Sequence, residues 1–185
     1  GAKPANLIGS LGEDGNSNLA IFSSVVHLGS NPPFLGIITR PEFEVSRHTL
    51  ENIRSKKFYS INSVPNSKIK QAHYTSAKFP KGISEFDQCD FQEEYIDEFP
   101  IPFVKSASIK IGMSLSEEIH IKSNNTLLLV GRVELIVIKD YFETAENGMI
   151  NLEQLNLVAI GGLNAYYSLK EIERLPYARV SDWKK

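Results

Sequence analysis

The chain has 185 residues, of which 42% are hydrophobic and 23% charged. This length and composition predict one globular domain over residues 1–185 with a continuous apolar core. Its formal net charge of −2 gives no field that would attract nucleic acid or an anionic membrane surface. No apolar run approaches the ~20 residues of a membrane-spanning helix. The single cysteine, Cys89, cannot form an internal disulfide, which fits a reducing compartment and predicts a cytoplasmic protein.

The N-terminal segments predict short strands separated by turns. Residues 6–11 are an apolar strand, and Glu13–Asn16 (EDGN) carries the Asp-Gly signal of a tight turn. Residues 18–30 predict a second strand region with apolar residues on both faces, which suits a barrel strand. Pro32 and Pro33 donate no backbone N–H, so they must interrupt the ladder before a third strand over residues 34–39.

Helical signals follow. Ser46 or Thr49 can cap a helix that runs to about Ser55. Residues 58–64 then predict a strand, and residues 67–73 predict a short helix.

Strands dominate the next part of the chain. Residues 76–102 are rich in proline and predict a loop. Residues 107–116 alternate as a strand, and residues 126–140 predict the longest strand of the chain. Six or seven strands with two or three short helices and no βαβ rhythm favour a mainly β protein, an antiparallel barrel with short peripheral helices.

Near the C-terminus, residues 151–160 predict a helix because Leu152, Leu155 and Val158 form one stripe. In this interpretation Gly161-Gly162 is the helix stop, since the pair lacks the spacing of a phosphate-binding glycine loop. Residues 168–185 are charged, carry Trp183 near their end, and predict a C-terminal arm or a partly disordered tail.

Six motifs occur in a fixed order between Lys3 and Tyr167. They are Asn18–Ser24 (NLAIFSS), Asn31–Pro33 (NPP), Arg47–Asn52 (RHTLEN), Tyr74–Phe86 (YTSAKFPKGISEF), Leu129–Val133 (LVGRV) and Leu157–Tyr166 (LVAIGGLNAY). Together they resemble the flavin reductase-like FMN-binding split-barrel family, which includes flavoredoxin-like flavoproteins. Ile21 stands where that family usually has proline.

The resemblance implies an antiparallel split barrel that forms a homodimer with FMN at the subunit interface. It implies reduction of the flavin by NAD(P)H, with electrons passed to a partner oxygenase or another acceptor. The flavin carries the redox chemistry, so no side chain need act as a catalytic acid or base. Two alternatives stay open: a non-enzymatic FMN-binding electron carrier, and an enzyme similar to pyridoxamine-phosphate oxidase, which the motifs fit less well. Family members also carry about one further helix before the first strand, which implies a leader ahead of Gly1.

The resemblance also implies a set of cofactor-binding residues. They are Asn18, Ala20, Phe22, Ser23, Ser24, Arg40, Arg47, Thr49, Asn52, Ser76, Lys81 and His120. No catalytic residue is expected. The scattered histidines and the single cysteine form no ligand pattern, so no metal site is expected either.

Several of these residues can also have a purely structural or surface role instead of binding the cofactor. Ser23, Ser24 and Thr49 carry hydroxyls suited to a phosphate, but the serines can be plain strand residues and Thr49 can cap its own helix. Arg40 directly follows a predicted strand, so we favour it over Arg47 as the phosphate contact. Lys81 and His120 can equally be solvated surface residues.

Overall fold

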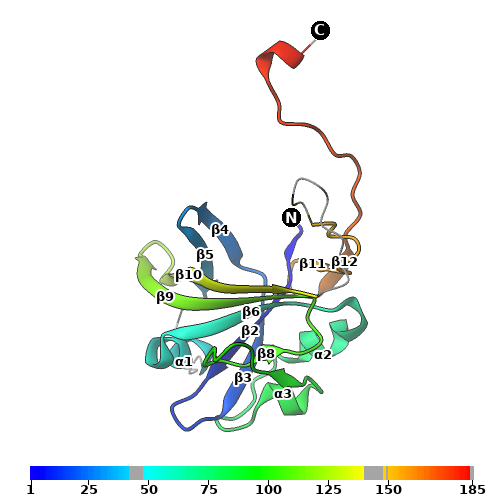
Figure 1. Ribbon diagram of the computed structural model, residues 1–185. Coiled ribbons are helices and arrows are strands. Elements are labelled where there is room, and N and C mark those ends of the chain that lie inside the picture. The colour runs from blue at the N-terminus through cyan, green and yellow to red at the C-terminus, as the bar shows by residue number, and fades with distance from the viewer. Residues whose placement is uncertain (42–47, 140–147, 149, 184–185) are drawn as a thin grey trace.

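The computed structural model describes residues 1–41, 48–139, 148 and 150–183 (Figure 1). Its architecture is an antiparallel split β-barrel with a few short helices, which confirms the predicted fold class. The first strands are β1 (Lys3–Pro4), β2 (Asn6–Leu11), β3 (Ser17–Phe22), β4 (Val25–Ser30), β5 (Pro33–Thr39) and β6 (Phe58–Ser63). The later strands are β7 (Glu93–Glu94), β8 (Phe103–Val104), β9 (Ile109–Ile121), β10 (Thr126–Ile138), β11 (Val158–Gly161) and β12 (Ala165–Ser168). The helices are α1 (His48–Lys56), α2 (Ile69–Tyr74) and α3 (Glu85–Gln88), with 3₁₀ turns η1 (Asn66–Lys68) and η2 (Val180–Asp182).

The barrel is one seven-stranded sheet in the order β3-β2-β6-β9-β10-β5-β4. Its two end strands, β3 and β4, are consecutive in the chain and joined by Ser23 and Ser24, so the sheet curls back on itself. Each ladder is antiparallel, and the longest joins β9 to β10 with two register shifts. A separate small sheet has the order β1-β11-β12, and β7 pairs with β8.

Alternation along the strands divides the core into three clusters. Side chains from inward-facing strand positions fill the barrel interior, and Leu50 and Ile53 of α1 close it. The buried residues of this cluster are Ile8, Ile37, Leu50, Ile53, Tyr59, Ile61, Met113 and Leu129. Leu7 and Leu19 point the other way, into a second cluster that includes Phe86 of α3 and Val158 of β11. A third cluster of Phe99, Ile101 and Phe103 covers the outer face of β6, β9 and β10.

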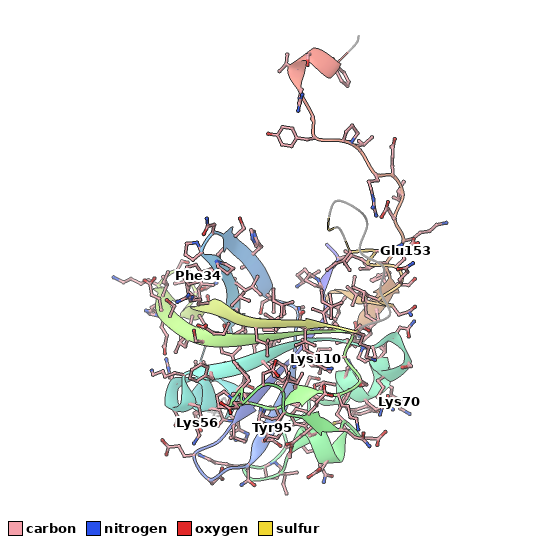
Figure 2. The ribbon with its side chains drawn as sticks, in the orientation of Figure 1. Phe34, Lys56, Lys70, Tyr95, Lys110 and Glu153 are labelled. Carbon is pink, nitrogen blue, oxygen red and sulfur yellow. The ribbon has the colours of Figure 1, made fainter. Side chains whose placement is uncertain are left out.

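A buried ion pair attaches residues 93–104, which carry the third cluster, to the barrel. Lys110 of β9, labelled in Figure 2, is 5% exposed. Its Nζ lies 2.7 Å from Glu94 Oε2 of β7. Asn62 of β6 continues this attachment, since its Oδ1 accepts a hydrogen bond from the Val104 N–H at 2.9 Å. These contacts hold residues 93–104 against the sheet, so this part of the expected 76–102 loop is ordered by tertiary contacts.

The expected 76–102 loop contains the helix α3 and the strand β7, and two further sequence expectations are wrong. The predicted helix over 151–160 is absent: residues 152–156 form turns, and Val158–Gly161 is the buried strand β11. A short apolar run such as residues 157–160 fits a strand as well as a helix, and here pairing with β1 and β12 decided between them. Gly161 and Gly162 therefore end a strand, with Gly162 in a left-handed turn at φ +60°. The single strand expected over 18–30 is two strands, β3 and β4, separated at Ser23 and Ser24.

Glu85 protects the open edge of β3. Its side chain is buried, and Oε2 accepts a hydrogen bond from the Leu19 N–H at 3.0 Å. An edge strand leaves such backbone groups without a ladder partner, so this carboxylate takes the place of a neighbouring strand. Burial raises the pKa of Glu85, although the hydrogen bond from Leu19 acts in the opposite direction.

The Tyr59 hydroxyl is buried in the barrel with no hydrogen-bond partner among the described residues, and Gly131 makes room for it. A Cβ at residue 131 would overlap Tyr59 Oη and lie 2.9 Å from Tyr59 Cζ. We expect Gly131→Ala to destabilise the protein by about 1–3 kcal/mol through overpacking. Tyr59→Phe should be close to neutral, because it removes an unsatisfied polar group.

Chemical denaturation of both single variants and the double variant measures the coupling. The double variant should recover part of the loss caused by Gly131→Ala. Recovery should be partial because Met113 Cε would still lie 3.0 Å from the new methyl group. Strictly additive losses would contradict the assigned contact.

Two substitutions at Glu85 separate its acceptor oxygen from its charge. Glu85→Ala should cost on the order of 1–3 kcal/mol, because it leaves the buried Leu19 N–H unpaired. Glu85→Gln keeps an acceptor oxygen, so it should be clearly milder than alanine when unfolding free energies are compared at neutral pH.

The pH dependence gives a second check. A carboxyl group whose pKa is raised on folding holds its proton at pH values where the unfolded chain has lost it. Its contribution to stability is therefore fully present below the ordinary value of 4.5 and declines as pH rises through the folded pKa. The unfolding free energy of wild type relative to Glu85→Gln should fall over that range. A difference independent of pH would show that burial does not perturb Glu85.

Candidate cofactor site at the start of α1

Four of the expected cofactor-binding residues meet around the first turns of α1. Asn18 Nδ2 of β3 donates to Thr49 Oγ1 at 3.0 Å, and both side chains are buried. Asn52 Nδ2, one turn further along the helix, donates to Ser10 Oγ of β2 at 3.1 Å. These two hydrogen bonds fix the helix against the β2–β3 hairpin, so the position of its N-terminal end is set by the barrel.

The loop Pro80–Gly82 brings a cation to the same place. Lys81 Nζ lies 3.4 Å from Glu51 Oε2 in the first turn of α1. Gly82 has φ +87°, a conformation that favours glycine, and it lies beside Asn16 of the β2–β3 turn. The loop therefore turns sharply between the hairpin and the helix, with the lysine side chain largely exposed at 74%.

The inner face of β3 extends this cluster. Ala20 and Phe22 alternate with Asn18 on one face of the strand and are half-buried, and Phe22 packs against the barrel core. Past β3, the Ser24 hydroxyl donates to the Ile38 carbonyl at 2.6 Å, and the Ile38 N–H donates to the Ser24 carbonyl at 3.0 Å. The residues that follow β3 are thereby held beside the end of β5, while neighbouring Ser23 is half-buried.

Arg40 is exposed and follows directly after β5, whose last residue is Thr39. Thr39 is 6% exposed, and its hydroxyl has no hydrogen-bond partner within the described ranges. A hydroxyl and a guanidinium are both groups that donate to an anionic oxygen. The sequence interpretation did not single out Thr39.

The other expected residues are placed differently. His120 is exposed near the end of β9. It pairs with Leu127 of β10, and Leu127 pairs with Thr39 of β5, so His120 and Thr39 lie on the same sheet face. Their backbones are two strand spacings apart, about 10 Å. The Ser76 hydroxyl donates to the His73 carbonyl at 2.7 Å, a local bond at the end of α2 that does not join it to the cluster. Arg47 lies outside the described residues.

Three participants lacked an assigned role in the sequence interpretation: Ser10, Thr39 and Glu85. Ser10 is a fully buried polar residue in an otherwise apolar strand, and that interruption of the pattern was a usable signal. Glu85 belongs to the quoted motif Tyr74–Phe86, but only the structure shows its bond to β3.

The chemistry of the cluster suits an anion more than a metal. The polar groups around the start of α1 are amides, hydroxyls and the Lys81 ammonium, beside the Glu51 carboxylate, at the positive end of a nine-residue helix. Across the part of the chain that the structure describes, no group of three or more His, Cys, Asp and Glu residues is placed to hold a metal ion. Nor does any described helix have the length and apolar character needed to cross a membrane.

Solved structures with this architecture are numerous. A split-barrel protein of Shewanella frigidimarina NCIMB 400, assigned as a flavin reductase, is 43% identical, with a TM-score of 0.91 over 96% of this chain and 87% of that one. Nitrilotriacetate monooxygenase component B of Bacillus cereus is 23% identical, with a TM-score of 0.84 over 94% and 87% of the two chains. Flavoredoxin of Desulfovibrio vulgaris (Miyazaki F) is 14% identical, with a TM-score of 0.81 over 96% and 92%; these last two share the fold.

The sequence itself settles the family. Residues 2–149 match the model of the flavin reductase-like domain, which covers most of the chain and includes β1 to β10 and the α1 cluster described above. The protein therefore belongs to the flavin reductase-like domain family.

Proposed function

We propose that the protein is an FMN-binding oxidoreductase that reduces its flavin with NAD(P)H. The observation that carries the proposal is the convergence of Asn18, Thr49, Asn52 and Lys81 at the start of α1, in a chain of the flavin reductase-like family. These four residues come from three separate motifs, and the fold brings them to one place.

The donor set fits a phosphate group. We assign the phosphate of FMN to Arg40, Thr49 and Lys81, with the first turn of α1 providing a favourable dipole. Ala20, Phe22, Ser23 and Ser24 follow on the adjoining strand edge. They are the residues that would hold the rest of the flavin, and His120, on the same sheet face as Thr39, would approach it from β9. Bound flavin supplies the redox chemistry, and the protein supplies binding and orientation.

The site as one chain builds it is open on one side, since Arg40 and the Lys81 side chain are exposed. We propose that a second copy of the chain provides the missing wall, so that the protein works as a cytoplasmic homodimer. The structurally similar Bacillus cereus protein is named as component B of nitrilotriacetate monooxygenase. Its likeness supports a partner oxygenase as one electron acceptor for this protein.

Flavin binding and turnover are tested in sequence. FMN fluorescence during titration with the apo-protein should show saturable binding at micromolar concentration with about one site per subunit. NADH and NADPH oxidation is then followed at saturating FMN. Rapid oxidation supports the reductase, tight binding with negligible turnover supports the electron carrier, and no saturable binding contradicts both.

Arg40→Ala should weaken FMN much more than riboflavin. A charge-assisted contact to phosphate contributes on the order of 1.5–3 kcal/mol, which corresponds to roughly 10- to 150-fold in Kd. Riboflavin lacks the phosphate and should lose little. Lys56→Ala removes a cation from the opposite end of α1 and is the matched control. Equal losses for the two flavins would place the phosphate elsewhere, with Thr49, Ser23, Ser24 and Lys81 as the next candidates.

A further inference from the structure

The chain ends in an extended arm, residues 169–183, that leaves β12 and projects away from the body (Figure 1). Near its start the Glu171 N–H donates to Glu153 Oε1 at 2.7 Å, which fixes the direction in which the arm departs. Beyond that point its large apolar side chains are mostly in solvent: Ile172 is 98% exposed, Leu175 73%, Tyr177 88%, Val180 95% and Trp183 78%.

Such a run indicates a binding segment. Single exposed apolar residues are normal on a surface, but several large ones in succession mark an interaction site, and solvated tails are depleted in them. Through Trp183 the charges of the arm balance, with Lys170, Arg174 and Arg179 against Glu171, Glu173 and Asp182, and the sequence adds Lys184 and Lys185 after it. Two excess positive charges give only a weak attraction for nucleic acid or an anionic membrane, so an apolar protein surface is the chemistry that the arm fits best.

The body of the same chain offers such a surface over Gly36. Methyl groups of Val26, Leu28 and Leu128 gather there, within 2.8–3.2 Å of where a Cβ at residue 36 would lie. Val26 and Leu28 are 40% and 45% exposed on β4, an end strand of the sheet. Ile119, paired with Leu128 across the β9–β10 ladder, is also 40% exposed and extends this Gly36 patch.

We propose that the arm of one chain packs across the Gly36 patch of a second copy. The arm's fifteen residues reach about 50 Å when extended, whereas a body of this size is roughly 40 Å across. The arm is thus long enough to cross a neighbouring subunit. Each chain carries one arm and one patch, so reciprocal exchange satisfies both and closes at two copies. The exit direction held by Glu171 and Glu153 takes the arm away from its own body, which favours the neighbour's patch.

Trp183 is the only tryptophan, so its fluorescence reports the environment of the arm directly. In the full-length protein its emission should lie at shorter wavelength than that of free tryptophan. On dilution it should move to longer wavelength in step with loss of dimer measured by sedimentation. Short-wavelength emission that persists after sedimentation shows the dimer to be lost would show that the arm folds on its own chain. Emission like free tryptophan at every concentration would show that the arm stays in solvent. Either result overturns the proposal.

Leu28→Asp tests the patch, with Leu163→Asp as its matched control. Leu163 is a more exposed leucine, 68%, in the β11–β12 turn outside the patch. Leu28→Asp should move Trp183 emission to longer wavelength and weaken arm docking by about tenfold or more, whereas Leu163→Asp should change neither. Circular dichroism establishes that both variants are folded.

A mixing experiment then decides whether docking occurs between chains. The Leu28→Asp chain has an intact arm, and a full-length Trp183→Phe chain has an intact patch but no tryptophan signal. Adding excess Trp183→Phe chain should restore short-wavelength emission from the Leu28→Asp chain. Adding the double variant Leu28→Asp/Trp183→Phe should not. Failure of restoration, or restoration by both chains, overturns the proposal. These measurements use no flavin, so their outcome is independent of whether the proposed oxidoreductase function is correct.

Discussion

The buried hydrogen bond from Asn18 to Thr49 joins the barrel to the helix that closes it. Asn18 lies on the inner face of β3, and Thr49 lies in the first turn of α1, so the bond fixes where the helix begins. Leu50 and Ile53 then seal the barrel core from the next positions on the same helix. One contact therefore aligns the apolar closure of the core with the polar cluster above it, and a shift of α1 would disturb both.

Local sequence pattern predicted the barrel strands well, because their alternation has a definite inner and outer face. The bounds of β2 agree with the expected residues 6–11, and β10 begins where expected at Thr126. The pattern failed where tertiary pairing decides. Val158–Gly161 is a buried strand because it pairs with β1 and β12. The chain leaves β3 at one end of the seven-stranded sheet and enters β4 at the other end, so the two strands separate at Ser23 and Ser24.

The site was predictable to the extent that motifs supply residues, since Asn18, Thr49, Asn52 and Lys81 were expected and do meet. Residues that act through distant partners were harder to predict. Nothing local marks Glu85 as the cap of an edge strand 66 positions away in sequence. Ser76 was expected at the cofactor from its motif position, and in the structure its hydroxyl donates to the His73 carbonyl at the end of α2.

Lys81 and Glu51 illustrate how such a site can be stable without ligand and still receive one. Glu51 is favoured in the first turn of α1 by the helix dipole, and it gives Lys81 a counter-ion in the protein alone. An exposed pair of this kind contributes only ~0–1 kcal/mol, because water screens it and both side chains lose freedom. A charge-assisted bond from lysine to a phosphate contributes more, on the order of 1.5–3 kcal/mol. In the proposed function the lysine can therefore exchange its carboxylate partner for the cofactor at a net gain, while the Asn18–Thr49 and Asn52–Ser10 bonds keep α1 in place.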